Sequence, residues 1–222
     1  MSERVDLAVI GGGPAGSAAA MRAARAGASV AVFESGERGR DKICGDGLTP
    51  RAVAALKELD IPIDASHRIS GLRMIAGRQI RELPWPETDR FPGYGAVWPR
   101  QSLDAELIGA AESAGATVSF QSTARPIIED DVVRGVRVEC AAGTREVYAE
   151  KVIVATGAPG AVARDLGAVR VADEPFGLAI RSYVESPRHA DDMLEACLTL
   201  RDEHGTPVPG YGWMFPCGDG SV

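Results

Sequence analysis

Three glycines near the start of the 222-residue chain have the spacing of a phosphate-binding turn. In the pattern G-x-G-x-x-G, formed by Gly11, Gly13 and Gly16, the first glycine allows a tight turn and the second lets the backbone approach a pyrophosphate. The third lets a helix pack closely on a strand. Pro14 and Ala15 begin that helix, whose N-terminal N–H groups and dipole favour a bound anion. The pattern therefore predicts a dinucleotide site.

Glu34 is the acidic partner that this pattern requires. It comes about 20 residues after the glycines, where a carboxylate accepts hydrogen bonds from a ribose hydroxyl. A carboxylate repels a 2′-phosphate, so the residue favours FAD or NAD over NADP. The alternative is an ordinary tight turn between a strand and a helix. The apolar run 5–10, the alanine-rich stretch after the glycines and Glu34 together favour the nucleotide site.

A second glycine-rich loop, residues 44–47, follows a polar stretch and precedes a predicted helix. Thr49 is a good N-cap and Pro50 suits the first helical position, so the loop is held firmly at one end. Gly45 and Gly47 would let the backbone approach a flat or bulky group. Cys44 is a candidate for chemistry there, although a free cysteine is often only a small buried hydrophobe.

The elements that must position these residues alternate between strand and helix patterns. The sequence predicts a strand at 5–10, a helix that ends at Gly27 and a strand at 29–33. A helix at 100–114 and a strand at 117–123 should add a third parallel strand. The remaining predicted strands are a β-meander at 126–129, 132–140 and 146–148, and a buried strand at 151–155 that ends in Thr156 and Gly157.

Two other regions differ from this pattern. Residues 66–97 contain short β-prone pieces interrupted by proline and glycine, and short aromatic pieces return from 175 onward. We interpret both as parts of a second domain. The predicted fold class is α/β, with a Rossmann-like nucleotide domain and β-meander (1–65 and 98–172) interleaved with an incomplete α+β domain (66–97 and 173–222).

Composition excludes several classes of function. The net charge is −7 and the basic residues are dispersed, so nothing suggests a nucleic-acid partner. No apolar run approaches the roughly 20 residues of a spanning helix, and the first strand begins too early for a signal peptide. The four cysteines lie far apart and the three histidines have no ligand-like spacing. We therefore expect no metal and a reducing, cytoplasmic setting.

Together these features resemble the flavoproteins related to p-hydroxybenzoate hydroxylase, and among them the geranylgeranyl reductase branch. The general resemblance rests on the glycine motif, Glu34, Arg100 at a helix start, and the turn 155–157. The branch-specific resemblance rests on two motifs. Loop 44–47 is similar to the family's cysteine–glycine loop beside the flavin, and the stretch 211–216 (Y-x-W-x-F-P) is similar to its substrate-cavity motif. The whole chain most resembles the menaquinone reductases of actinobacteria.

The resemblance implies FAD as cofactor and an FAD-binding role for the nucleotide domain, with the second domain binding substrate. Members of the family continue well beyond this length, so the chain resembles their N-terminal portion, and 218–220 should be only a hairpin turn. Arg100 could instead be a solvated arginine and 156–157 a plain turn. The implied cofactor contacts are Gly11, Gly13, Pro14, Ala15 and Gly16 at the pyrophosphate, Glu34 at the ribose, Ala124 at the adenine, Arg100, Thr156 and Gly157 along the cofactor, and Cys44, Gly45 and Gly47 at the isoalloxazine.

The implied activity is reduction of a C=C bond in an isoprenoid lipid, most closely the prenyl tail of menaquinone. The catalytic candidates are Cys44, Tyr211 and Trp213. Cys44 would either donate a proton or shape the cavity, and water or Tyr211 could be the donor instead. The alternatives are an FAD-dependent monooxygenase or halogenase of the same fold and a non-catalytic dinucleotide-binding module.

The expected partners follow from this substrate. A second nicotinamide-type glycine motif is absent from the sequence, so the electron donor is not identified. An isoprenoid quinone does not diffuse through water, so we expect peripheral association with the inner face of the cell membrane. The apolar pieces 83–86 and 91–92 are the candidate membrane contacts, although aromatic residues interrupted by prolines more often pack within ordinary loops.

Overall fold

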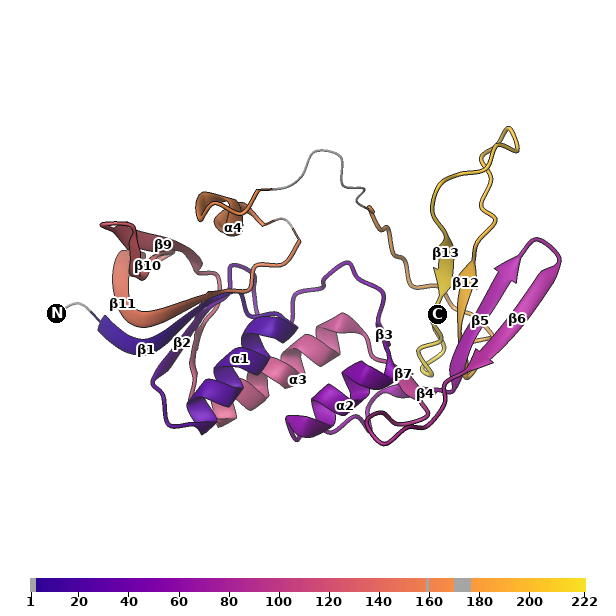
Figure 1. The fold of residues 1–222 in the computed structure, drawn as a ribbon, viewed down its shortest axis with the longest axis horizontal. Coiled ribbons are helices and arrows are strands. Elements are labelled where there is room, and N and C mark those ends of the chain that lie inside the picture. The colour runs from indigo at the N-terminus through magenta and orange to yellow at the C-terminus, as the bar shows by residue number, and fades with distance from the viewer. Residues whose placement is uncertain (1–2, 159, 170–176) are drawn as a thin grey trace. The chain divides into compact units, whose positions relative to one another are not determined.

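The computed structural model describes residues 3–158, 160–169 and 177–222, which form two compact units (Figure 1). One unit contains residues 1–41 and 101–174, and the other contains 42–100 and 175–222. The sequence pattern places the first boundary at residue 66, whereas packing assigns the stretch from Lys42 onward to the second unit, because β3 (Gly47–Leu48) pairs with β7 (Gly95–Val97) there. The functional meaning of each unit stays a prediction.

The first unit is built on a six-stranded sheet in the order β8-β2-β1-β11-β10-β9. β2 pairs in parallel with both β1 and β8, which confirms the predicted third parallel strand. β9, β10 and β11 form the antiparallel meander. The strands are β1 (Glu3–Ile10), β2 (Val30–Phe33), β8 (Thr117–Ser119), β9 (Thr123–Glu129), β10 (Val132–Cys140) and β11 (Gly143–Val154).

β11 corrects one prediction. The sequence pattern divides this region into a meander strand at 146–148 and a separate buried strand at 151–155, but the structure has one continuous strand. Its first half pairs antiparallel with β10, and it pairs in parallel with β1 from Val147 to Val154. Because β1 supplies hydrogen-bond partners across the expected break, the polar residues there do not end the strand.

Three of the described helices, α1, α3 and α4, belong to this sheet's unit. α1 (Pro14–Arg25) buries Ala20 and Met21, and it contacts β1 and β2 (Figure 1). α3 (Arg100–Ser113) buries Leu103 and Leu107 on the face that the periodicity predicts. A short helix, α4 (Ala161–Asp165), places Val162 in the core that the meander strands also form.

The second unit contains two small sheets, in the orders β13-β12-β5-β6 and β3-β7-β4. Helix α2 (Pro50–Glu58) begins as predicted, with the Thr49 hydroxyl accepting a hydrogen bond from the Ala52 N–H at 3.4 Å. Within the described ranges, no helix is both long and apolar enough to cross a bilayer. The other strands are β4 (His67–Ile69), β5 (Gly71–Ala76), β6 (Gln79–Pro84), β12 (Met193–Cys197) and β13 (Gly212–Met214).

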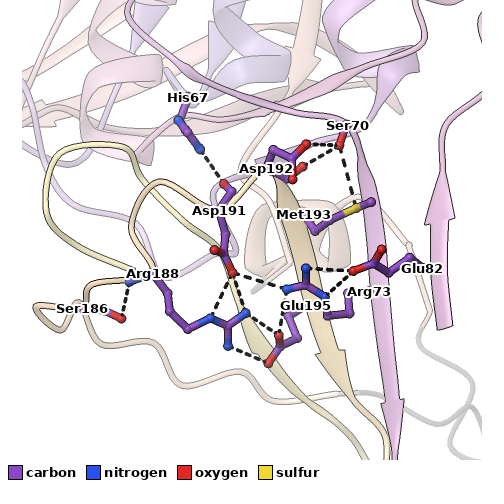
Figure 2. A network of polar contacts seen from close by, with 10 residues as sticks. All are labelled: His67, Ser70, Arg73, Glu82, Ser186, Arg188, Asp191, Asp192, Met193 and Glu195. Atoms are coloured by element: carbon purple, nitrogen blue, oxygen red, sulfur yellow. Dashed lines mark hydrogen bonds and ion pairs between the residues drawn. The ribbon is translucent and has the colours of Figure 1, made fainter. Parts of the chain in front are cut away.

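An ion-pair network joins the strands of the larger of these sheets (Figure 2). Arg188 Nη2 lies 2.6 Å from Asp191 Oδ2 and 2.7 Å from Glu195 Oε2. Arg73 on β5 donates to Glu82 on β6 at 2.9 Å and to Asp191 at 3.3 Å. Hydrogen bonds from Arg188 hold the pKa of the Asp191 carboxyl below its usual range, and those to Glu195 and Asp191 raise the pKa of Arg188. The network thus links side chains of β5, β6 and β12, whose main chains are already paired in the sheet.

Candidate functional site

The predicted phosphate turn has the geometry that its glycines imply. Gly11 has φ +104°, and a Cβ there would lie 2.5 Å from the Ala155 carbonyl oxygen. A Cβ at Gly16 would lie 1.9 Å from the Gly11 carbonyl oxygen, so α1 could not pack this closely with any larger residue. A Cβ at Gly13 would meet no atom within 4 Å. Two glycines are therefore required by packing, and the third leaves open space at the start of α1.

The N-terminus of α1 is suited to an anion. Gly13 is the N-cap and provides no side-chain hydrogen bond to the first turn, and Pro14 occupies the first helical position. A helix beginning of this kind presents N–H groups and the positive end of the dipole. Ala15 continues the same turn of helix. Main-chain N–H groups beside an open glycine are what a pyrophosphate requires.

Glu34 is buried at the end of β2, and its carboxylate is held by the glycine turn. Oε2 accepts a hydrogen bond from the Gly12 N–H at 2.7 Å, and Oε1 accepts one from the Gly36 N–H at 2.8 Å. Arg40 donates to both oxygens, at 3.0 and 3.3 Å. Burial raises the pKa of Glu34, but the hydrogen bonds from Arg40, Gly36 and Gly12 outweigh it and lower the pKa. Glu34 is thus an ionised acceptor.

Arg40 is a partner of Glu34 that the sequence analysis missed. Its two N–H donors face the two carboxylate oxygens, as the two hydroxyls of a ribose would. The available signal was an opposite charge a few residues beyond Glu34 in the same loop.

The turn after β11 lies beside the glycine turn. The Ala155 N–H donates to the Ile10 carbonyl at 2.8 Å, and Gly157 has φ +75°. A Cβ at Gly11 would lie 3.3 Å from the Thr156 main-chain nitrogen. The structure therefore brings Thr156 to the phosphate turn, while its contact with a cofactor stays a prediction.

The secondary structure predicted around Ala124 is wrong. The sequence pattern places it just past a strand at 117–123, but β8 ends at Ser119 and β9 begins at Thr123. Ala124 is therefore inside β9, opposite Val138 of β10, and it is buried in the core. The separate meander strand starts earlier than its apolar residues suggest. The contact of Ala124 with adenine stays a prediction.

In the second unit, loop 44–47 packs against the aromatic motif. A Cβ at Gly45 would lie 2.6 Å from Cε2 of Phe215, and one at Gly47 would lie 3.2 Å from the same atom. The flat group that these glycines approach in the structure is thus the ring of Phe215. Cys44 is a half-buried free cysteine beside them.

Asp46, between these two glycines, connects three segments of the second unit and was missed by the sequence analysis. Its main-chain carbonyl accepts from the Trp98 N–H, and its Oδ1 accepts from the Arg100 N–H, both at 2.9 Å. Its Oδ2 accepts from the Tyr183 hydroxyl at 2.7 Å and lies 3.4 Å from Arg181 Nη1. The main-chain N–H of Arg100 therefore binds the Asp46 carboxylate. The contact of Arg100 with the cofactor stays a prediction.

A pocket of about 180 Å³ lies beside this cluster. Asp46, Arg181 and Tyr183 form its polar part, and Trp213 and Phe215 of the aromatic motif belong to its apolar part. The complete lining is Asp46, Arg181, Ser182, Tyr183, Val184, Trp213, Met214, Phe215 and Val222. The pocket therefore combines buried charge with apolar walls.

The predicted catalytic residues are only partly brought together by this pocket. Trp213 lines it, whereas Cys44 and Tyr211 are not among the lining residues. Tyr211 is 57% exposed, with its ring centroid 6.3 Å from that of Trp213. Burial raises the pKa of the nearby Cys217 thiol, with the carboxylates of Asp219 and Asp46 acting in the same direction.

Comparison with known proteins identifies the family. The model of the family described as FAD dependent oxidoreductase matches residues 6–174. The chain belongs to this family. The cofactor of this flavoprotein family is FAD, which confirms the cofactor predicted from the glycine turn and the resemblance.

The chain is also similar to individual reductases of known name. It is 41% identical over 224 residues to a menaquinone reductase of Mycolicibacterium smegmatis, covering 100% of this chain and 54% of the relative. It is 32% identical over 217 residues to digeranylgeranylglycerophospholipid reductase 1 of Methanopyrus kandleri, covering 96% and 55%. The chain thus spans about half the length of the curated relatives it matches. The expected resemblance to geranylgeranyl reductases and menaquinone reductases is confirmed.

A solved structure confirms the fold class. A geranylgeranyl bacteriochlorophyll reductase-like protein of Thermoplasma acidophilum superimposes with a TM-score of 0.76 at 27% identity, covering 100% of this chain and 55% of that one. The mixed α/β sheets described above are therefore those of an FAD-dependent oxidoreductase fold.

The residues of the first unit fit FAD. Gly13 leaves space for a pyrophosphate beside an uncapped helix N-terminus, and Glu34 offers an ionised acceptor for a ribose. Among the described residues, no cluster of histidine, cysteine and acidic side chains suits a metal ion.

Proposed function

We propose that the protein is an FAD-dependent reductase that saturates a C=C bond in an isoprenoid chain, and that this chain is the prenyl tail of menaquinone. The observation that carries the proposal is the 41% identity to a menaquinone reductase across the whole of this chain. The similarity to a digeranylgeranylglycerophospholipid reductase supports the broader class of prenyl substrate.

The residues have separate tasks in this reaction. Reduced FAD supplies a hydride when bound. The glycine turn and Glu34 hold the pyrophosphate and ribose, and loop 44–47 provides a main chain without side-chain bulk at two positions. The apolar walls at Trp213 and Phe215 hold a hydrocarbon chain and exclude water. An acid must supply the second hydrogen as a proton.

We also propose that the protein binds membranes peripherally, because its substrate lies in the bilayer. Only part of the stretch 83–86 is exposed and able to contact a membrane. Leu83 is exposed on β6, whereas Trp85 packs on Gly95 and on the apolar cluster around Ile69. Exposed Ile80 and Phe91 join Leu83 as the proposed contacts.

Anaerobic turnover tests the proposed activity. The protein expressed from its complete reading frame is loaded with FAD, reduced with dithionite without oxygen and incubated with a prenyl lipid, and the lipid is analysed by mass spectrometry. A reductase adds two hydrogen atoms to the tail. Product formation only after oxygen is admitted would indicate a monooxygenase or halogenase, and no product under either condition would indicate a binding module.

A further inference from the structure

We propose that the surface of the second unit that carries Ile80, Leu83 and Phe91 also binds the anionic headgroups of a phospholipid bilayer, through basic side chains beside these apolar residues. This role rests on the proposed membrane association and names the chemistry of the membrane, a leaflet whose headgroups carry net negative charge. The basic residues of this surface, all exposed and all within residues 42–100 of that unit, are Lys57, Arg68, Arg78, Arg81 and Arg90.

The segment that contains most of these residues is basic, although the protein is acidic. Residues 67–97 include five arginines and three acidic residues, whereas the whole chain has 24 basic and 31 acidic residues. One of the three acids, Glu82, already accepts a hydrogen bond from Arg73 at 2.9 Å, which leaves Glu87 and Asp89. A negatively charged surface is therefore repelled by the net charge of the chain but attracted by this segment.

The five basic side chains differ from the arginines of the ion-pair network and of the Asp46 cluster. Arg73, Arg181 and Arg188 lie 2.9, 3.4 and 2.6 Å from a carboxylate oxygen. In the part of the chain that the structure describes, none of the five basic residues forms an ion pair with a carboxylate. A phosphate group can therefore bind them without breaking an existing ion pair.

On β6, basic and apolar side chains lie side by side along the outer strand of a sheet. β6 is the last strand in the order β13-β12-β5-β6. Ile80 is 54% exposed and Leu83 is 47% exposed. Arg81 lies between them and shares a face of the strand with Leu83, and Arg78 occupies the turn that precedes the strand. The strand thus presents hydrocarbon and positive charge together.

The loop after β6 repeats this combination. Phe91, which is 36% exposed, directly follows Arg90. Tyr94, in the same loop, has two cations at its ring: Arg68 Cζ lies 3.9 Å from the ring centroid, and Lys57 Nζ lies 5.2 Å from it. Two like charges at one ring repel each other, and a phosphate beside them relieves this repulsion. Tyrosine is also typical of the headgroup level of membrane proteins.

A bilayer matches this surface better than other polyanions do. Its interfacial layer offers acyl chains and phosphate groups side by side, so exposed apolar residues and nearby cations bind it together. A nucleic acid offers phosphates but no hydrocarbon layer for Ile80, Leu83 and Phe91. Arginines on an outer strand have a second use, since charge there discourages pairing with another sheet. That use requires no lipid, so lipid binding separates the two roles.

Sedimentation with vesicles tests the proposed role, using the protein from its complete reading frame. Vesicles of phosphatidylcholine alone are compared with vesicles that also contain phosphatidylglycerol, and the ratio of the two partition coefficients is measured. We expect the wild-type protein to favour the anionic vesicles at least about tenfold, because several basic residues act together near the surface. Raising the salt concentration should reduce this ratio.

Two variants locate the effect. An Arg81→Gln, Arg90→Gln protein should lose most of the anionic preference and should still bind phosphatidylcholine, because the apolar residues are unchanged. The control is an Arg134→Gln, Arg201→Gln protein, which loses the same charge from exposed arginines outside residues 42–100. The control should keep the wild-type ratio. Thermal unfolding midpoints of the three proteins show whether folding is retained.

The outcomes separate this role from the proposed membrane association. If the wild-type protein sediments with neither kind of vesicle, the association fails and the headgroup site fails with it. If it sediments equally with both kinds, the association stands and the headgroup site is wrong. An anionic preference that survives the Arg81→Gln, Arg90→Gln change, or that falls equally in the control, would also overturn the assignment to this surface.

Discussion

The ring of Phe215 lies against the main chain of Gly45, so closely that a Cβ on this glycine would come within 2.6 Å of the ring atom Cε2. The contact joins the two motifs on which the resemblance to prenyl reductases rests. Phe215 also packs with Leu194 and Cys217 in an apolar cluster, which limits how far the ring can move. The shape of loop 44–47 therefore depends on an aromatic residue far along the chain.

Adding a methyl group at Gly45 should strain this contact. We expect Gly45→Ala to lower the free energy of unfolding by about 1–3 kcal/mol, because a packed ring and the loop must separate. In a Phe215→Leu background the same change should cost clearly less. Urea unfolding of the wild-type protein, the two single variants and the double variant measures the coupling free energy between Gly45 and Phe215. Strictly additive effects would show that the ring does not constrain the loop.

Gly13→Ala should separate cofactor binding from folding. A Cβ at Gly13 meets no protein atom within 4 Å, so the fold should be retained. The methyl group would nevertheless occupy the space into which a pyrophosphate comes, and we expect FAD affinity to fall at least about tenfold, or 1.4 kcal/mol. Flavin fluorescence titration and thermal unfolding are measured together.

Gly16→Ala provides the contrast for that experiment. Its Cβ would lie 1.9 Å from the Gly11 carbonyl oxygen, so this variant should lose stability as well as FAD binding. If a folded Gly13→Ala protein binds FAD as tightly as the wild type, the pyrophosphate does not bind at the glycine turn and the prediction is wrong.

The Arg188–Asp191 ion pair should make stability depend on pH at the acid end. Hydrogen bonds from Arg188 lower the pKa of folded Asp191, so the pair stabilises the fold above about pH 4, the unfolded pKa, and this stability is lost as pH falls through the folded pKa. Both side chains are partly exposed, so Asp191→Asn should cost only about 1 kcal/mol at neutral pH.

Urea unfolding of this variant and the wild-type protein at neutral pH and near pH 3 checks the sign. The difference between the two proteins should shrink in acid and also in high salt. A difference that grows in acid would mean that Asp191 does not act as an ionised partner.

Much of the first unit could be predicted because its signals are local. The glycine spacing, the alanine-rich helix and the strand 30–33 each specify their own conformation, and Glu34 falls at the position that the turn requires. The continuity of β11 could not be predicted in the same way. Its second half is held by β1, which lies far earlier in the sequence, and a local pattern cannot reveal that pairing.

The polar cluster of the second unit could not be predicted for a similar reason. Asp46 and Tyr183 are separated by 137 positions, and their hydrogen bond exists only because the fold brings the two segments together. Periodicity indicates which side of a segment is apolar, but it does not show which buried polar groups will pair. Arg40 is only six positions from Glu34, but their ion pair could not be predicted either. It depends on the conformation of the loop between them, which no periodic pattern of apolar residues specifies.

Membrane association should depend on exposed apolar residues near β6. We expect vesicles of zwitterionic phospholipid to pull down the protein from the complete reading frame, and a variant with Ile80→Ser, Leu83→Ser and Phe91→Ser to remain largely in solution. Trp85→Phe is the matched control, since that ring packs inside the unit. Wild-type protein that does not sediment with vesicles would contradict the proposed association.

The saturation state of a menaquinone tail after one anaerobic turnover tests the account most directly. The quinone ring can itself accept electrons from a reduced flavin, so the sample is returned to air to reoxidise any quinol before the tail is analysed by mass spectrometry and fragmentation. The account predicts a quinone that keeps two added hydrogens, both located in one isoprene unit. A quinone that returns to its starting mass, with every tail double bond intact, would contradict it.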